Sequence, residues 1–242
     1  MSARLPRSVR SLRCITIRHW TVMPATGANT QSVVEYVIGA MLTLQRSAFT
    51  STRHVAAGDW PRASLGAGAE VSGRTLGLIG FGTIAQAVAD VARALGMTIA
   101  AFDPFLPDTD PAWSAARRCT LETLLQTADV VSLHVPLTEG TTGMLNAAAL
   151  ATMKRGAILI NTARGGIVDE AALVQSLKSG HLGGAAIDVF EQEPLDPSTG
   201  ARFVDCPNLI LTPHIAGVTA DANVRVSRLT VENVKRVLLD QG

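Results

Sequence analysis

Short apolar runs alternate with helical patterns through most of the chain, and this alternation limits the possible fold more than any other feature. Strand-length runs occupy residues 75–80, 97–103, 129–137, 156–162, 182–190 and 208–214. Helical spacing predicts helices at 83–95, 120–128, 146–154 and 169–180 and a terminal helix at 219–239. Strands that are apolar throughout and alternate with helices indicate a parallel sheet with both faces covered. We therefore predict an α/β protein with a doubly wound parallel sheet.

Charge and cysteine usage exclude several classes of function. Residues 1–34 hold five arginines and no acid, whereas the other 208 residues carry 16 basic and 20 acidic groups. The body of the protein therefore lacks the basic footprint of a nucleic-acid partner. No apolar run approaches the roughly 18–20 residues of a membrane span, so no membrane partner is expected. The three cysteines lie far apart, which argues against a metal site or disulfides and favours a reducing, cytoplasmic compartment.

A glycine pattern stands between the first strand and the helix that follows it. The segment GLIGFGTIA contains Gly80, Gly82 and Ala85 in a G-x-G-x-x-A arrangement. The first glycine permits a tight turn, the second lets the backbone approach a pyrophosphate, and the third position must be small for helix and strand to pack. Asp103 ends the next strand, 23 residues after Gly80, where a carboxylate can accept the ribose hydroxyls of NAD and repel the 2′-phosphate of NADP. This pattern favours NAD binding over a turn in which Asp103 only caps a loop.

Another helix is expected to begin at Ser32, ahead of the glycine pattern. The segment SVVE is a capping box, in which Ser32 would accept from the amide of Glu35 while Glu35 reaches back to the cap. Apolar residues follow at helical spacing and predict a broad buried face. Residues 56–73 are rich in glycine and aperiodic, which indicates a loop or a crossing between domains.

The last three strands are followed by residues suited to anion binding and acid–base chemistry. Arg164 follows 156–162, Asp188 and Glu193 follow 182–187, and His214 follows 208–212. Because ligands of an open parallel sheet bind outside the carboxyl ends of the strands, these side chains could share one cleft with a nicotinamide.

The residue types suit the reduction of a 2-keto acid. A protonated His214 can supply a proton to the keto oxygen, and Glu193 can orient its ring. Arg164 can hold the substrate carboxylate in a forked contact, while Asp188 suits the nicotinamide ribose or carboxamide. Taken singly, such residues are more often a structural histidine, a turn residue, a surface arginine and a loop cap. Their joint placement behind a dinucleotide turn favours an active site.

Five ordered motifs resemble the D-isomer-specific 2-hydroxyacid dehydrogenases, a family of NAD-dependent oxidoreductases that includes D-3-phosphoglycerate dehydrogenase. They are TLGLIGFGTIA, ADVVSLHVPLT, INTARGGIVDEAAL, GAAIDVFEQEP and LTPHIAG, and the resemblance extends from about Thr21 to Leu238. The segments PATGANTQSVVEYV, GDWPR and HIAGVT resemble the sulfolactate dehydrogenase branch. The resemblance implies a Rossmann-type NAD-binding domain and a small 2-hydroxy or 2-keto acid substrate.

The resemblance also implies roles for individual residues. Arg164 would bind the substrate carboxylate and keto oxygen, and Glu193 would pair with His214 as the acid/base. No metal ligand is implied, and His181 is expected to be exposed in a turn. The residues implied in cofactor binding are Gly80, Gly82, Thr83, Ile84, Asp103, His134, Val135, Pro136, Thr162, Ala163, Arg164, Asp188, His214 and Gly217.

The family pattern also predicts how the chain is divided. Residues 1–20 form an atypical arginine-rich head, 21–218 an NAD-binding domain with a leading interdomain helix, and 219–242 a helix that returns toward a substrate-binding domain. The family places roughly 100 residues before Thr21, so only a remnant of that second domain is expected here and the head is a non-native or frameshifted segment or a transit peptide. Three outcomes stay open: an active dehydrogenase, an inactive fragment, and a non-catalytic NAD-binding dimeric regulator of the corepressor type. A homodimer is implied, with the helix from Ser32 and residues 56–73 at the interface, although burial against the second domain also explains that apolar face.

Overall fold

Seven parallel strands form the central sheet of the computed structural model, which describes residues 15–17 and 20–239. Their spatial order is β5-β4-β3-β6-β7-β8-β9, so the first strand of the sheet lies in its interior and the order reverses between β3 and β6. This is the doubly wound topology, whose ligand crevice lies at the reversal. The strands are β3 (Thr75–Ile79), β4 (Thr98–Phe102), β5 (Arg117–Arg118), β6 (Val130–Leu133), β7 (Ile158–Asn161), β8 (Gly184–Ile187) and β9 (Leu209–Leu211).

The sequence prediction of a doubly wound α/β fold is confirmed, with one strand more than expected. The edge strand β5 consists of two exposed arginines, Arg117 and Arg118, that pair with Ala100 and Ala101. A two-residue polar strand has no apolar run, so periodicity could not reveal it. The other six strands begin or end one to four residues inside their predicted ranges.

Helices cover both faces of the sheet. One face carries α1 (Thr30–Gln45) and α4 (Thr83–Ala94), which pack with Leu76, Leu78 and Ile160. The other carries α5 (Leu121–Thr127), α6 (Ala147–Thr152) and α7 (Glu170–Lys178). At Gly77 a Cβ would lie only 2.6 Å from the Leu124 side chain, so the glycine allows α5 to pack close to the sheet.

The expected capping box at Ser32 is wrong. Helix α1 begins at Thr30, with Asn29 as its N-cap residue, and no side chain caps it. Ser32 is buried and its hydroxyl lies 3.0 Å from that of Thr219, while Glu35 accepts from Gln31 at 2.8 Å. A distant hydroxyl, invisible to local sequence, therefore takes the place of the predicted cap bond.

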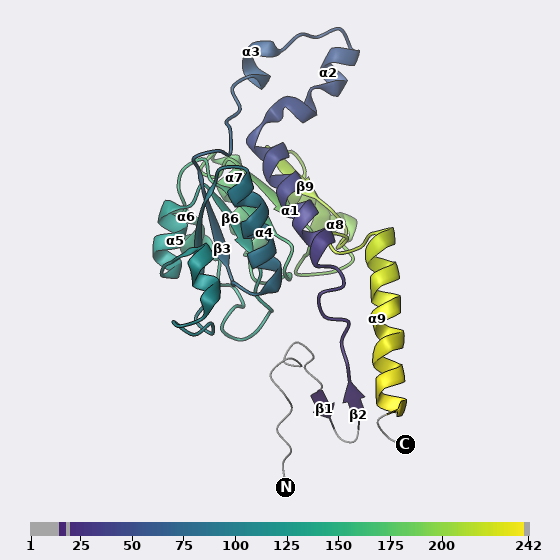
Figure 1. The fold of residues 1–242 in the computed structure, drawn as a ribbon. Helices are drawn as coiled ribbons and strands as arrows, with labels where there is room; N and C mark the ends of the chain where they lie inside the picture. The colour runs from purple at the N-terminus through teal and green to yellow at the C-terminus, as the bar shows by residue number, and fades with distance from the viewer. Residues whose placement is uncertain (1–14, 18–19, 240–242) are drawn as a thin grey trace.

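Several peripheral segments lie outside the sheet layers. The short helices α2 (Thr52–Ala56) and α3 (Arg62–Leu65) project from the sheet domain as an arm, and α3 lies inside residues 56–73, which were predicted as a loop (Figure 1). The long helix α9 (Ala220–Leu239) runs beside β2 (Trp20–Val22), which pairs with β1 (Ile15–Ile17). Most of the predicted arginine-rich head, residues 1–14 and 18–19, lies outside the described residues. A short helix, α8 (Pro197–Gly200), precedes β9.

Candidate active site

The glycine turn after β3 has the conformation that the sequence pattern requires. Gly80 has a φ of +84°, and a Cβ there would lie 2.6 Å from the carbonyl oxygen of His134, so no side chain is tolerated. Gly82 is the N-cap residue of α4, and a Cβ at Gly82 would meet nothing within 4 Å. Ala85 is 1% exposed between α4 and the sheet. The turn therefore leaves open space in front of the first amides of α4, where a phosphate group binds favourably.

A cavity of about 220 Å³ opens at this helix end. Of the predicted cofactor residues, Gly82, Thr83, Ile84 and His134 line it. Ala85 of the glycine pattern also lines it, together with residues that the sequence reasoning did not assign to the site: Thr26, Gly27, Asn29 and Thr30. These four lie in the segment PATGANT, which carried a family resemblance but no chemical pattern of its own.

Two buried hydroxyls in this region have no hydrogen-bond partner among the described residues. They belong to Thr30, at the cavity, and to Thr162, which was predicted to contact the cofactor. An unpartnered buried hydroxyl carries a free-energy cost that a bound ligand can relieve. Burial lowers the pKa of His134 to about 4, so its imidazole is a neutral wall residue, bonded to the Ser132 hydroxyl at 2.9 Å.

Asp103 lies at the end of β4, next to the glycine turn. One carboxylate oxygen accepts from the amide of Phe81 at 2.9 Å, and the other accepts from the amides of Phe105 (2.9 Å) and Leu106 (3.2 Å). This half-buried carboxylate thus joins the loop after β4 to the turn after β3. Its position beside the turn is the one that ribose recognition requires in this topology.

Glu193 and His214 are in direct contact. The Nδ1 atom of His214 lies 2.7 Å from Oε2 of Glu193, and the other oxygen of Glu193 accepts from the amide of Phe190 at 2.8 Å. Burial alone would raise the pKa of Glu193, but the hydrogen bonds and the charges of His214 and Arg164 outweigh it and lower the pKa. An ionised carboxylate can only accept, so Nδ1 of His214 carries the proton of this bond. The remaining ring nitrogen, Nε2, is left free for proton exchange.

Arg164 follows β7 in a turn held by a buried amide. The Asn161 side chain is almost fully buried, donates to the carbonyl of Arg164 at 3.0 Å and accepts from the amide of Ala163 at 3.0 Å. The Arg164 guanidinium donates to the carbonyl of Ala163 at 2.6 Å and is exposed. Asn161 therefore fixes the path of the backbone from which the Arg164 side chain extends.

The turn of Arg164 touches the loop of Glu193 through a glycine. A Cβ on Gly165 would lie 1.7 Å from the carbonyl oxygen of Phe190 and 2.8 Å from the amide nitrogen of Glu191. Glu170, which is 5% exposed, accepts from the same Glu191 amide at 2.7 Å and pairs with Arg202 at 3.2 Å. Gly165 and Glu170 were not predicted as site residues, although Gly165 lies inside a motif that was.

The resemblance implies that Asp188 contacts the nicotinamide carboxamide, and in the structure its side chain is bonded within the protein. It is 1% exposed, and its carboxylate accepts from the hydroxyl of Thr212 (2.5 Å) and from the amides of Ile215 and Ala216 (2.8 Å each). Its carbonyl accepts from the amide of His214 at 2.8 Å. In this structure the side chain holds the turn of His214.

The other predicted residues lie in the turns after β6, β7 and β9, apart from His181. Val135 and Pro136 follow β6 at the glycine turn, and Ala163 is buried in the turn of Arg164. Gly217 lies against Asn29, since a Cβ on Gly217 would be 2.5 Å from its amide nitrogen. His181, expected to be exposed, is half-buried, and its Nε2 lies 3.1 Å from the carbonyl oxygen of Leu150.

The neighbourhood of the Glu193–His214 pair is open and apolar on one side. A cavity of about 600 Å³ adjoins it, lined by Phe190, Glu193, Pro194, Leu195, Leu211, Thr212, Pro213 and His214. Within residues 15–17 and 20–239 no group of three or more histidine, cysteine or carboxylate side chains is arranged to hold a metal ion. Over the same residues no helix has the length and hydropathy to cross a membrane. The fold and these contacts define a dinucleotide-binding domain that carries an acid–base pair at the carboxyl edge of its sheet.

Comparison with known proteins agrees with this class. Residues 38–216 match the family profile of the D-isomer specific 2-hydroxyacid dehydrogenase, NAD binding domain. The chain is 56% identical over 218 residues to the (S)-sulfolactate dehydrogenase of Chromohalobacter salexigens, covering 90% of this chain and 70% of that protein. It is 42% identical over 217 residues to the hydroxypyruvate reductase of Thermotoga maritima, with the same coverages of 90% and 70%. The structure of a D-2-hydroxyisocaproate dehydrogenase superimposes with a TM-score of 0.81 at 30% identity, over 89% of this chain and 68% of that one.

The chain therefore belongs to the D-isomer specific 2-hydroxyacid dehydrogenase family. Its cofactor is NAD, and the family consists of oxidoreductases that act on the CH–OH group of small hydroxy acids. The predictions of family, fold class, cofactor and enzyme class are confirmed.

Proposed function

We propose that this chain interconverts a 2-hydroxy acid and its 2-keto acid with Arg164, Glu193 and His214 as its catalytic residues. The contact that carries the proposal is the 2.7 Å bond between Nδ1 of His214 and Glu193, at the edge of the sheet where Arg164 also emerges. A surface histidine has no need of an oriented carboxylate, whereas an acid/base catalyst does, because the carboxylate fixes the ring and favours its charged form.

The residues around the glycine turn suit the cofactor. The open space in front of Gly82, the free amides of α4 and the unpartnered hydroxyls of Thr30 and Thr162 are features that a bound dinucleotide would fill. Thr83 and Ile84 would lie along the pyrophosphate, Asp103 would accept from the adenosine ribose, and His134 would form part of the wall. NAD supplies the hydride acceptor or donor of the reaction when bound.

The three proposed catalytic residues have separate roles in the reaction. Nε2 of His214 would give a proton to the keto oxygen in reduction and take it back in oxidation. Glu193 stabilises the protonated ring that exists between these events. Arg164 would bind the substrate carboxylate, because a guanidinium presents paired donors that match the two oxygens.

For the substrate we propose a short 2-hydroxy acid with a second anionic group, of the kind named in the 56% identical (S)-sulfolactate dehydrogenase. The segments PATGANT and HIAGVT that support this branch both lie at the site, since Thr26 to Thr30 line the cofactor cavity and His214 belongs to the acid–base pair.

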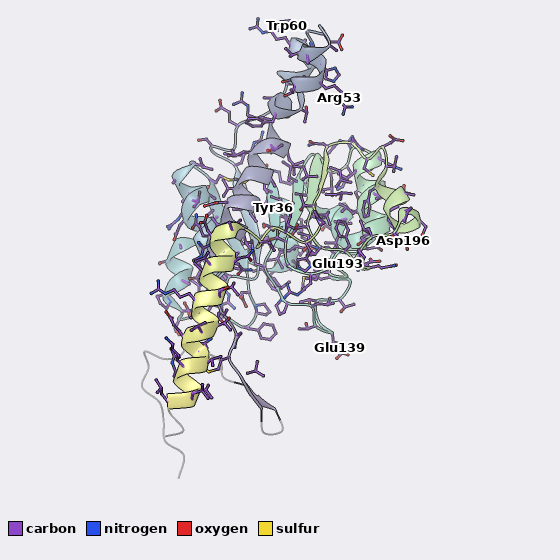
Figure 2. The ribbon with its side chains drawn as sticks, turned by 90° about the vertical axis from the view of Figure 1, so that its right-hand side faces the viewer. Tyr36, Arg53, Trp60, Glu139, Glu193 and Asp196 are labelled. Carbon is purple, nitrogen blue, oxygen red and sulfur yellow. The ribbon has the colours of Figure 1, made fainter. Side chains whose placement is uncertain are left out.

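We also propose a cytoplasmic homodimer in which the arm formed by α2 and α3 contacts a second copy. The arm exposes large apolar side chains, with Trp60 at 77% and Val55 at 48% exposed, and Trp60 stands at its tip (Figure 2). Phe49, in the turn that leads into the arm, is 68% exposed. Residues 21–218 would form the NAD-binding domain, and the exposed apolar face of α9 would pack against a substrate-binding domain. Sedimentation of the wild type against Trp60→Ala tests the dimer, since a wild-type monomer would refute it.

The experiment on function measures NADH fluorescence and NADH oxidation against a panel of 2-keto acids. We expect binding without substrate, and turnover that is highest with an acid carrying a second anionic group. His214→Gln should lower kcat by about 10²–10⁴-fold with NADH affinity unchanged. His181→Gln, at a half-buried histidine outside the site, is the matched control and should retain activity. NADH binding with no turnover on any acid would refute the catalytic proposal and support the regulator or inactive-fragment alternative.

A further inference from the structure

One face of α1 lies along the segment that carries His214. Three of its residues, Asn29, Ser32 and Tyr36, follow one another at spacings of three and four, so they share one side of the helix. Asn29 lies against Gly217, the Ser32 hydroxyl bonds that of Thr219 at 3.0 Å, and Tyr36 Oη lies 2.6 Å from Oγ1 of Thr212. The helix thus contacts both ends of residues 212–219, with His214 between them.

The bond at Tyr36 continues into the sheet as a directed chain. Thr212 donates its hydroxyl proton to Oδ1 of Asp188 at 2.5 Å. A hydroxyl has one proton, so Thr212 can only accept from Tyr36, and the phenol must be the donor. Burial and the nearby charge of Asp188 raise the pKa of Tyr36 against the opposing effect of the Thr212 bond, which keeps the phenol protonated.

This chain of hydrogen bonds ends at the turn that carries His214. Oδ1 of Asp188 accepts from both the Thr212 hydroxyl and the Ile215 amide, and Oδ2 accepts from the amide of Ala216. His214 itself has a φ of +56°, a conformation that costs a non-glycine residue of order 1–3 kcal/mol and persists only where its surroundings enforce it. The buried carboxylate and the groups that orient it are those surroundings.

We propose that Tyr36 and Thr212 are positioning residues that act through Asp188 to fix the 212–216 turn and aim His214 at Glu193 and the substrate. Figure 2 labels Tyr36, on α1, and Glu193, in the loop whose carboxylate bonds His214. The inference rests on the proposed role of His214 in proton transfer. It also makes the leading helix of the NAD-binding domain a part of the active site, because a shift of α1 would reach the histidine through three side chains.

The test removes single hydroxyls and measures both the turn and the reaction. Tyr36→Phe removes only the phenol oxygen, Thr212→Val removes the central link, and Thr212→Ser restores a hydroxyl at that link. Thr43→Val is the control, because Thr43 lies on the same helix and its hydroxyl bonds only the carbonyl of Gly39 within it, at 2.8 Å. Amide hydrogen exchange at Ile215 and Ala216 reports the turn without any need for turnover.

We expect Thr212→Val to lower kcat by roughly 10–100-fold and Tyr36→Phe by about 3–10-fold, with NADH affinity unchanged, since misplacement of a catalytic group by about 1 Å costs of order 10². Exchange at Ile215 and Ala216 should be faster in both variants, and Thr212→Ser should restore kcat and exchange to near wild type. The proposal is overturned if Tyr36→Phe and Thr212→Val match Thr43→Val in kcat and exchange. It is also overturned if kcat and NADH affinity fall together and Thr212→Ser does not rescue them. If the wild type turns over no 2-keto acid, the proposed function fails. Amide exchange at Ile215 and Ala216 still tests the positioning role, since faster exchange in the two variants supports it and unchanged exchange overturns it.

Discussion

Replacement of Gly165 by alanine should separate the turn of Arg164 from the loop of Glu193. The new Cβ would lie 1.7 Å from the carbonyl oxygen of Phe190, whereas real Cβ contacts essentially never fall below 3.0 Å. The two backbone segments must therefore move apart by about 1.3 Å or more, and no flexible side-chain end is present to absorb the shift. Glu193 lies three residues beyond Phe190 and bonds both the Phe190 amide and His214, so the movement reaches the acid–base pair.

The size of the effect follows from that displacement. A shift of about 1 Å in a catalytic group costs roughly 100-fold in rate, so kcat should fall about 100-fold in Gly165→Ala. Overpacking of this kind costs about 1–3 kcal/mol of stability, which corresponds to a loss of roughly 3–10 °C in Tm. NADH affinity should fall much less than kcat, because the pyrophosphate turn at Gly80 lies on β3, separated from β7 by β6, and only the Thr162–Arg164 end of the proposed cofactor site adjoins Gly165.

The assay compares steady-state NADH oxidation, NADH binding and thermal unfolding in Gly165→Ala and in Gly200→Ala. Gly200 is the matched control, because it has a φ of −66° and a Cβ there would meet nothing within 4 Å. Alanine at this position should leave kcat unchanged and Tm the same or slightly higher. The steric reasoning is refuted if Gly165→Ala keeps a kcat within twofold of Gly200→Ala while both proteins are folded.

Three further predictions concern stability. Burial lowers the pKa of His134 from 6.5 to about 4, so the folded protein resists its protonation. The stability that the neutral His134 contributes is complete above pH 6.5, and up to about 3 kcal/mol of it is lost as the pH falls to 4. Denaturant titrations of His134→Gln should therefore show a flatter dependence of stability on pH between 6.5 and 4. Asp103→Ala removes the acceptor of three amides and should lower the stability of the cofactor-free protein by about 2 kcal/mol, and equal unfolding midpoints would contradict this. Burial would raise the pKa of Asp129, but the bonds with Lys154 (2.5 Å) and the Thr75 amide and the charge of Arg74 outweigh it and lower the pKa. The stability that the ionised Asp129 contributes is therefore present above the ordinary pKa of 3.8 and is lost as the pH falls through the lowered pKa. Lys154→Met should therefore cost about 0.5–1 kcal/mol at neutral pH and nothing in acid, as measured by urea unfolding at both pH values.

The sequence predicted the sheet because the sheet is encoded locally. Each central strand is apolar on both faces, and Gly80 with Asp103 marks the reversal point where ligands bind. The strand-end rule also selected Arg164, Glu193 and His214, and the structure brings the last two into contact. What local pattern could not supply was β5, whose two arginines have no apolar signal, and the start of α1, where Ser32 bonds a residue 187 positions away.

The sequence also could not tell apart the surroundings of its two strand-end carboxylates. Asp188 and Glu193 both follow β8, and five residues apart they offer the same functional group. Only the structure distinguishes them, since Asp188 is 1% exposed with both oxygens bonded inside the protein, while the Glu193 side chain is 35% exposed and faces His214. Burial is a property of the whole fold, so it could not be read from the residues around each carboxylate.

The buried polar residues explain how a site made of loops is kept rigid. Each loop that presents a reacting group is held by a side chain fixed at the end of the sheet or of a helix: Asn161 holds the turn of Arg164, Glu170 the loop of Glu193, and Asp188 the turn of His214. All three are 5% exposed or less, and each bonds backbone atoms of the loop. A buried polar group left without its partner costs about 1–3 kcal/mol, more if it is charged, so each anchor also resists any movement of its loop. If Arg164, Glu193 and His214 react as proposed, these three anchors set the geometry of the reaction, and their replacement should lower kcat more than it lowers the stability of the core.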